Sequence, residues 1–301
     1  VNESLSHGIF PDSYKEAIIS PLLKKANLEH TFKNYRPVSN LEFLSKLIEK
    51  IVVSQLLKHA NDNGLLEKFQ SAYKPAHSTE TALLRVQNDI KIAMDKKQAV
   101  ILVLLDLSAA FDTIDHDLLL NRLSHSIGIK GTVLQWFKSY LKSRHQQVSI
   151  NGEHSSRAEI KCGVPQGSVL GPVLFTLYMS PLGEIMRKYN LSFHIYADDT
   201  QLYIMFKPTM ENLVLSVSVL QMCIKEIQDW MLANKLKLND DKSEVLLLGT
   251  RQQLAKLNMD QFKIGECNIT VSSSARNLGV MFDDKMTMDV HINRICQVGF
   301  L

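Results

Sequence analysis

Residues 191–206 read LSFHIYADDTQLYIMF, and this stretch decides how the rest of the chain is interpreted. Two apolar runs flank two adjacent acids, Asp198 and Asp199, and in each run every second residue falls on one face, as in half-buried strands: Phe193 and Ile195 before the acids, and Leu202, Ile204 and Phe206 after them. The pattern predicts a β-hairpin with Ala197-Asp198-Asp199-Thr200 at its turn. Asp is a favoured turn residue, so the pair has an ordinary structural explanation. Two carboxylates on one turn also repel each other unless a cation lies between them, and a cation site is therefore the competing explanation.

Composition sets wide limits on the answer. A chain of 301 residues with 45% hydrophobic composition can bury a large core and divide into two lobes. No apolar run reaches the ~18 residues typical of a membrane span. The net charge of +3 is too small to identify a nucleic-acid-binding protein. Four widely spaced cysteines indicate neither a zinc site nor a disulfide framework, and we expect free thiols in a reducing intracellular compartment: Cys162, Cys223, Cys267 and Cys296.

The first hundred residues predict one strand and two helices. The strand is 17–20, ending at Pro21. Ser39 with Glu42 matches a capping box, followed by apolar residues at helical spacing as far as residue 61. A second amphipathic helix follows a loop at 69–80 and runs to about Met94. Arg36 and the basic loop are candidates for phosphate binding, against the simpler explanation of solvated surface residues.

Residues 99–105 read AVILVLL, and a continuous apolar run of this length predicts a strand buried on both faces. The run ends at Asp106, whose charge needs a partner, a metal ion or solvent at the margin of the sheet; a capping role for the next segment is the alternative. Further along, the patterns predict a helix at 131–143, a hairpin at Asn151-Gly152, a Gly/Pro loop at 162–172, an apolar helix at 173–179, a helix at 211–235, a strand at 244–248 and short strands near 261–271 and 278–282.

Asp106, Asp198 and Asp199 form a coherent set if the fold brings them together. Three carboxylates at one sheet edge suit two divalent cations held ~3.5–4 Å apart, as in in-line phosphoryl transfer. Mg²⁺ is the preferred ion, because it uses few carboxylates and completes its shell with substrate phosphates. The interpretation requires Asp106 to lie within about 8 Å of the hairpin turn.

Seven motifs in the same order give the chain a family resemblance. It resembles the reverse transcriptase domain of LINE-type (non-LTR) retrotransposons. YADD alone would be a weak signal, but the whole ordered set is specific: YRPVSNL at 35, QSAYKPAHST at 70, LLDLSAAFDTIDH at 104, GVPQGSVLGP at 163, YADD at 196, LNDDKSE at 238 and NLGVMFDD at 277.

The resemblance implies a set of site residues. Asp106, Asp198 and Asp199, with the backbone of Leu107, match the ligands of two Mg²⁺ ions, with Mn²⁺ as a substitute. Lys242 matches a lysine that protonates the pyrophosphate leaving group. The remaining matches concern the nucleotide and the primer: Phe111 as an aromatic steric gate against ribose, Gln166 and Gly167 behind the nucleotide, Lys74 and Arg36 near its triphosphate, and residues 277–284 as the primer grip.

One position departs from the family pattern. His77 stands where a second fingers arginine is usual, and a histidine is mostly neutral at pH 7. One phosphate contact is therefore expected to be weaker.

The implied fold is α+β, a right-hand polymerase fold in which an antiparallel palm sheet packs on helices. We expect fingers at about 1–97, palm at 98–250, and at 251–301 the end of the palm, the primer grip and the start of a thumb connection. The chain begins at Val1 and ends at Leu301, and we expect a fragment from which most of the thumb and an upstream endonuclease are missing. The implied partners are an RNA template, a DNA primer and dNTPs, without a membrane.

Two other functions remain open. A viral RNA-dependent RNA polymerase shares the palm, but it keeps an Asp where Phe111 stands, and Asp112 is one position too late. A catalytically silent or repurposed RNA-binding fragment is the second alternative, since template–primer binding needs a large phosphate-contacting surface.

Overall fold

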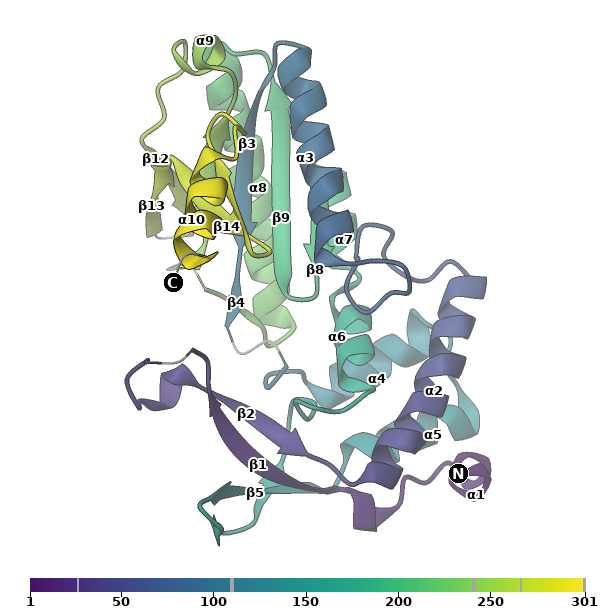
Figure 1. The fold of residues 1–301 in the computed structure, drawn as a ribbon. Helices are drawn as coiled ribbons and strands as arrows, with labels where there is room; N and C mark the ends of the chain where they lie inside the picture. The colour runs from purple at the N-terminus through teal and green to yellow at the C-terminus, as the bar shows by residue number, and fades with distance from the viewer. Residues whose placement is uncertain (26, 109–110, 240–241, 266, 300–301) are drawn as a thin grey trace. The chain divides into compact units, whose positions relative to one another are not determined.

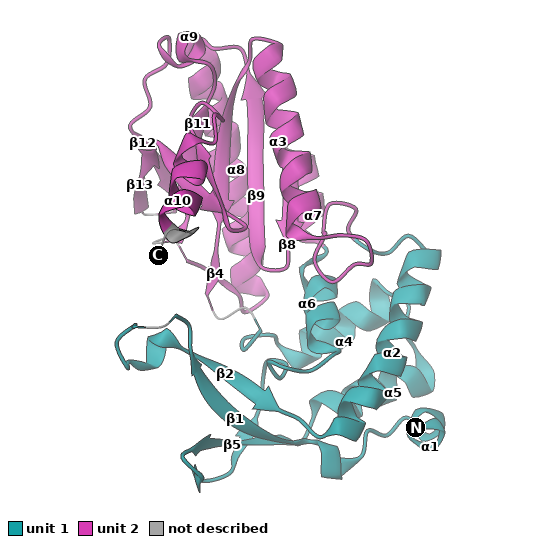
Figure 2. Cartoon of the chain, in the orientation of Figure 1, with its two compact units in different colours: residues 1–66, 109–180 teal, residues 67–108, 181–301 magenta. Residues whose placement is uncertain are grey.

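The computed structural model describes residues 1–25, 27–108, 111–239, 242–265 and 267–299 (Figure 1). The chain forms two compact units, each made of two separate segments (Figure 2). Unit 1 comprises residues 1–66 and 109–180, and unit 2 comprises residues 67–108 and 181–301. The chain therefore passes between the units three times. The division into fingers, palm and thumb connection remains a prediction.

Unit 2 is built on a sheet of six strands in the order β12-β13-β11-β3-β9-β8. The predicted strand at 99–105 is confirmed as β3 (Ala99–Leu105), which pairs antiparallel with both β9 and β11. Residues 99–103 are fully buried, as expected for a strand covered on both faces. The other strands are β8 (Ser192–Tyr196), β9 (Asp199–Phe206), β11 (Glu244–Leu248), β12 (Gln261–Ile264) and β13 (Cys267–Ser272).

Two long helices supply most of the packing on this sheet (Figure 1). Helix α3 (Thr79–Asp95) begins at Ser78, whose side chain forms a capping box with Thr81. Its apolar face packs against alternate residues of β3, among them Val100 and Leu102. Helix α8 (Met210–Ala233) packs against β9 and β12. Both helices match the sequence prediction in position and length.

The predicted hairpin at 191–206 is confirmed, with its turn one residue earlier than expected. Tyr196 pairs with Asp199 across the hairpin, so the connection is the two residues Ala197 and Asp198, and Asp199 already belongs to β9. Ala197 has a φ of 57°, in the left-handed region that a non-glycine residue occupies at a cost.

Unit 1 contains a second, smaller sheet in the order β2-β1-β5-β6, with β7 also paired to β5. The hairpin predicted at Asn151-Gly152 is confirmed, since both residues have positive φ (52° and 86°), as a two-residue turn of this type requires. The strands are β1 (Glu16–Leu23), β2 (Tyr35–Asn40), β5 (Arg144–Ile150), β6 (Glu153–His154) and β7 (Ala158–Ile160).

Two local predictions in unit 1 were wrong. Ser39 does not cap a helix: it lies buried in β2, paired with Ile19, and helix α2 (Phe43–Asp62) starts after Glu42 without a side-chain cap. Strand β1 does not end at Pro21 but continues to Leu23. β5 pairs with β1 only as far as Ile19, so the missing N–H of Pro21 costs no ladder hydrogen bond on that side.

The remaining helices and strands complete the two units. No helix among the described residues is long and apolar enough to cross a bilayer. The remaining bounds are α1 (Asn2–His7), α4 (His116–His125), α5 (Gly131–Leu141), α6 (Gly171–Met179), α7 (Leu182–Lys188), α9 (Arg251–Leu254), α10 (Asp289–Gly299), β4 (Leu107–Ser108), β10 (Lys237–Leu238), β14 (Ser274–Asn277), β15 (Val280–Asp283) and 3-10 turns at Asp12–Tyr14 and Phe32–Asn34.

Candidate active site

The three predicted acids lie at one end of the unit 2 sheet. Leu105, the last residue of β3, pairs with Thr200 of β9, and Asp106 follows Leu105 as Asp199 precedes Thr200. Opposed residues of an antiparallel pair lie about 4.5–5.5 Å apart between Cα atoms. Asp198 occupies the adjoining turn. The strand register therefore brings Asp106 and the turn to the same end of the sheet, and the limit of about 8 Å between them stays a prediction.

The charges of these acids act on one another. The pKa of Asp199 is raised to about 6, first by burial and then by the negative charges of Asp198 and Asp106. Lys242 places its Nζ 3.3 Å from Asp106 Oδ2, an ion pair whose lysine side chain is 65% exposed. Lys242 therefore lies next to the first of the three acids.

The chemistry of the donor set fits a divalent cation. Carboxylate oxygens and a backbone carbonyl, here that of Leu107 in β4, are the hard ligands that Mg²⁺ uses. The mutual repulsion that raises the pKa of Asp199 is the kind of charge excess that a cation relieves. Among the described residues, no three or more His, Cys, Asp or Glu side chains are placed so that they could hold a metal ion together as they stand.

The segment before α3 runs beside the hairpin. Phe69 O accepts from Ile195 N at 2.8 Å, and Ser71 N donates to Ile195 O at 3.0 Å. Gln70, between them, reaches the turn itself with its side chain. The segment is part of the motif at 70, but the sequence does not identify Gln70 as a site residue, because its partner Ala197 lies 127 positions away.

Lys74 is less available than the sequence suggested. Its Nζ donates to the Glu67 carbonyl oxygen at 2.7 Å, and burial lowers the pKa of Lys74 while Glu67 acts in the opposite direction. The Glu67 carboxylate is itself held by Arg187 at 2.9 and 3.0 Å. Any phosphate that approached Lys74 would therefore compete with a backbone carbonyl. His77, in the same loop, is exposed and its Nδ1 lies 2.9 Å from Pro75 O.

Unit 1 holds the other predicted residues. Gln166 donates through its side-chain Nε2 to both carboxylate oxygens of Asp112 at 3.0 Å. Its backbone carbonyl oxygen accepts from Ser39 N at 2.7 Å. Gly167 has a φ of 122°, and a Cβ there would lie 2.6 Å from Ser39 O, so only glycine fits. Phe111 is half-buried, with its ring centroid 4.7 Å from that of Phe175. Arg36 is exposed on β2.

Glu49 is a residue that sequence reasoning missed. Its side chain is fully buried on α2 and accepts hydrogen bonds from Val169 N (2.7 Å), Leu170 N (3.0 Å) and Ser45 Oγ (3.1 Å). The two bonds from Val169 and Leu170 connect α2 to the Gly/Pro loop that carries Gln166. A glutamate within a helical apolar stripe was the available signal.

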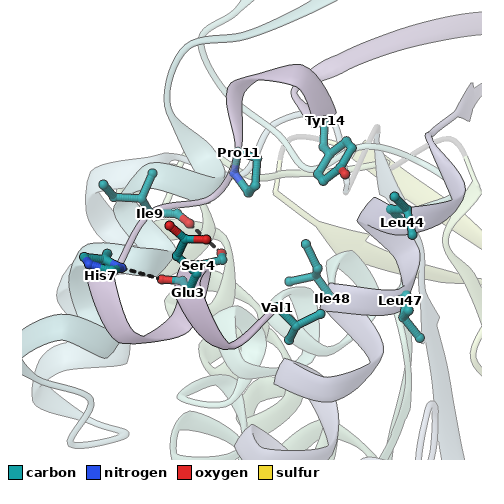
Figure 3. Close-up of a pocket in the computed structure, with 10 residues that line it drawn as sticks. All are labelled: Val1, Glu3, Ser4, His7, Ile9, Pro11, Tyr14, Leu44, Leu47 and Ile48. Carbon is teal, nitrogen blue, oxygen red and sulfur yellow. Dashed lines mark hydrogen bonds between the residues drawn. The ribbon is translucent and has the colours of Figure 1, made fainter.

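Cavities in unit 1 do not coincide with the acids. One, of about 410 Å³, lies between α1 and the start of α2 and contains none of the predicted site residues (Figure 3). Another, of about 450 Å³, is lined by residues that include Gln166 and Asp112. The residues lining the first are Val1, Glu3, Ser4, His7, Ile9, Pro11, Tyr14, Leu44, Leu47 and Ile48.

Comparison with curated proteins finds RNA-directed DNA polymerases of mobile elements among the relatives. The chain is 29% identical over 302 residues to the RNA-directed DNA polymerase from mobile element jockey of Drosophila melanogaster. It is 26% identical over 292 residues to the probable RNA-directed DNA polymerase from transposon X-element of the same species. The matches cover 98% and 95% of this chain but 32% and 31% of those proteins, so the chain spans about a third of their length.

Solved structures support the fold. Apo telomerase from Candida tropicalis, truncated from its C-terminal domain, superposes with a TM-score of 0.61 at 11% identity, covering 93% of this chain and 55% of that one. Telomerase from the same species in complex with a TWJ fragment of telomeric RNA gives 0.58 at 10% identity, covering 92% and 44%. The predicted α+β polymerase fold is thus confirmed.

A family model agrees with both comparisons. The model described as "Reverse transcriptase (RNA-dependent DNA polymerase)" matches residues 23–282, which include every predicted site residue except the last two of the primer grip, 283 and 284. The chain belongs to the reverse transcriptase family.

Proposed function

We propose that this chain is the polymerase core of a non-LTR retrotransposon reverse transcriptase. It extends a DNA primer with dNTPs along an RNA template. The observation that carries the proposal is the pairing of β3 with β9, which brings Asp106 and the Asp198-Asp199 turn to the same end of one sheet. Membership of the family and the names of the relatives support the choice of template and product.

In this proposal, Asp106, Asp198, Asp199 and the Leu107 carbonyl hold two Mg²⁺ ions, with Mn²⁺ as a substitute. When bound, such ions lower the pKa of an attacking hydroxyl and stabilise the charge that develops on phosphorus. The primer 3′-hydroxyl gives its proton to solvent and its oxygen forms a bond to the α-phosphorus. The bond from the α-phosphorus to the oxygen that bridges to the β-phosphate breaks, and pyrophosphate leaves. Lys242, held beside Asp106, gives a proton to that leaving group.

The nucleotide and primer contacts are proposed residue by residue. Phe111 excludes a ribose 2′-hydroxyl, and Gln166 and Gly167 lie in the loop behind the incoming nucleotide. Lys74 and Arg36 contact its phosphates, Lys74 after leaving the Glu67 carbonyl. Residues 277–284, most of which form the β14–β15 hairpin, grip the primer.

The first test is Asp198→Asn. Removing one carboxylate charge should lower primer extension at least about 1,000-fold, because charge stabilisation at phosphorus depends on the ions that this group helps to hold. Extension of a DNA primer on an RNA template with dNTPs is measured together with RNA binding, which should stay unchanged. Asp229→Asn, at an exposed acid paired with Lys225 on α8, is the matched control and should extend normally.

The outcomes separate polymerase from binding module. Wild type and Asp198→Asn that both bind RNA but extend no primer would refute the polymerase proposal and leave an RNA-binding fragment. A wild type that extends the primer but prefers NTPs to dNTPs would refute the role proposed for Phe111.

Phe111→Ala tests the steric gate directly. Removing the ring should raise the rate of NTP incorporation at least about tenfold relative to dNTP incorporation, because the clash with the 2′-hydroxyl disappears. The measurement is kcat/KM for one dNTP and the matching NTP. Phe69→Ala, an aromatic truncation outside the proposed gate, is the comparison and should leave the dNTP/NTP ratio unchanged.

A further inference from the structure

We propose that Gln70 is a positioning residue that holds the Asp198-Asp199 turn in its working geometry. The inference rests on the proposed function of that turn. Gln70 is 4% exposed. Its Oε1 accepts from Ala72 N at 2.8 Å and from Ala197 N at 3.1 Å, and its Nε2 donates to Ala197 O at 3.4 Å. We call these three bonds the Gln70 clamp.

The Gln70 clamp continues a set of backbone hydrogen bonds along the outer edge of β8. β8 is the last strand of its sheet, and an edge strand presents backbone groups that need other partners. Residues 69–71 supply them by bonding to both sides of Ile195. Ala197 lies two residues further on, and there the side chain of Gln70 takes over from the backbone.

Ala197 is the residue of the turn that most needs such support. It is 6% exposed, and a buried N–H or C=O without a partner is costly. Its φ of 57° is unfavourable for a residue with a Cβ. Asp198 and Asp199 follow it directly, and their like charges repel. Hydrogen bonds to both backbone groups of Ala197 oppose the relaxation of this strained, like-charged turn.

Gln70 therefore acts through the turn and touches no reacting group. Sites that bind ions or charged transition states depend on ligands held in place before binding. Loss of the clamp should weaken ion binding and slow the chemical step, with little effect on nucleotide binding. A residue that only stabilised the fold would change the melting temperature without this pattern.

The test is Gln70→Met, which keeps the length of the side chain and removes its amide. Three quantities are measured on the whole chain below its melting temperature: amide exchange of residues 195–199, Mn²⁺ affinity by electron paramagnetic resonance, and steady-state extension. We expect exchange about tenfold faster, Mn²⁺ binding about fivefold weaker, and kcat about tenfold lower with KM for dNTP changed less than about twofold.

Ser71→Ala is the matched control. Ser71 lies next to Gln70, is equally buried, and its Oγ lies 2.8 Å from Nε2 of His194 rather than bonding to the turn. It should lower the melting temperature but leave Mn²⁺ affinity and kcat per folded molecule at wild-type values.

A second variant tests the cause of the effect. Glycine takes the φ of Ala197 without strain, so Gln70→Met should be less damaging in an Ala197→Gly background. The double-mutant cycle should show coupling of about threefold or more in kcat.

Three results would overturn the clamp: wild-type exchange and Mn²⁺ affinity in Gln70→Met, an equal loss of kcat in Ser71→Ala, or strictly additive effects with Ala197→Gly. Failure of the proposed function is recognised separately, by a wild type that extends no primer. Exchange at residues 195–199 would still judge the clamp in that case.

Discussion

At the scale of single residues, the hairpin that bears the acids also bears a buried histidine. His194 on β8 is 3% exposed, and its Nε2 lies 2.8 Å from Ser71 Oγ. Its Nδ1 is buried without a hydrogen-bond partner among the described residues. Burial first, and then the positive charges of Arg85, His77 and Lys74, lower the pKa of His194 to about 4. The folded chain therefore keeps this ring neutral.

This shift predicts how stability depends on pH. The histidine of the unfolded chain binds a proton below its ordinary pKa of 6.5, while that of the folded chain does not until about 4. Stability should therefore fall as the pH drops from 6.5 to 4, by on the order of 3 kcal/mol. His194→Gln keeps a polar partner for Ser71 but has no titrating group at this position. The stability of this variant should therefore fall less between pH 6.5 and 4. Guanidinium unfolding at several pH values measures the difference.

The control for this prediction is His7→Gln. His7 is exposed on α1, so its replacement should not change how the free energy of unfolding falls with pH below 6.5. If the free energy of unfolding fell equally for His194→Gln and wild type, the protons taken up on unfolding would bind to other groups.

Residues also show how far sequence alone can define this site. Asp106, Asp198 and Asp199 could be selected because each directly follows or interrupts an apolar strand pattern. The roles of Gln70 and Glu49 could not be predicted, because both bond to backbone groups 120 or more positions away. A glutamate in an apolar helical stripe marks Glu49 as unusual, but no local pattern encodes such distant partners.

At the scale of elements, the accuracy of sequence prediction follows the strength of burial. β3, α3 and α8 were predicted correctly because an apolar run or a helical apolar stripe marks a strongly buried element. The capping box at Ser39 failed because strand pairing with Ile19 outweighed a local helix signal. The short helices α4 and α7 were not predicted, since each offers only two or three turns of pattern.

Glu49 makes an element-scale prediction about α2 and the Gly/Pro loop. Both backbone N–H groups donate to the same oxygen, Oε2, so Glu49→Gln can keep both bonds but makes their acceptor neutral. We expect a loss of about 2 kcal/mol in the free energy of unfolding, because hydrogen bonds to a charged acceptor are roughly twice as strong as those to a neutral one. Amide exchange should also become faster at 169–170. Denaturant unfolding and hydrogen exchange measure the two effects.

Glu42→Gln is the control on the same helix. Glu42 is exposed at the N-cap of α2 and makes no side-chain cap hydrogen bond. Its replacement should change stability by less than about 0.5 kcal/mol. If Glu49→Gln were as mild, Glu49 would not be what fixes the loop to the helix.

At the scale of the whole molecule, residues between 262 and 286 supply side chains to the core of unit 2. β13 pairs in parallel with β11, next to β3. Ala275, Phe282 and Met286 are buried in the cluster that α3, β3 and β11 form. Asn277 Nδ2 donates to Gln201 Oε1 on β9 at 3.0 Å, with both residues buried. This region thus supports the strand that begins with Asp199.

Ending the chain at Thr250 should therefore unfold unit 2. The cut removes Phe262, Ile264 and Phe282, each at most 1% exposed, and uncovers β11. Losing a buried Phe or Ile side chain costs about 2–5 kcal/mol, so three together approach the whole stability of a typical domain, about 5–15 kcal/mol. The shortened chain should aggregate on size exclusion and melt without a cooperative transition in circular dichroism. Starting the chain at Gly8 instead removes only α1, which has no buried residue, and should leave a cooperative monomer. A monomeric, cooperatively melting chain that ended at Thr250 would show that 251–301 is a separable module.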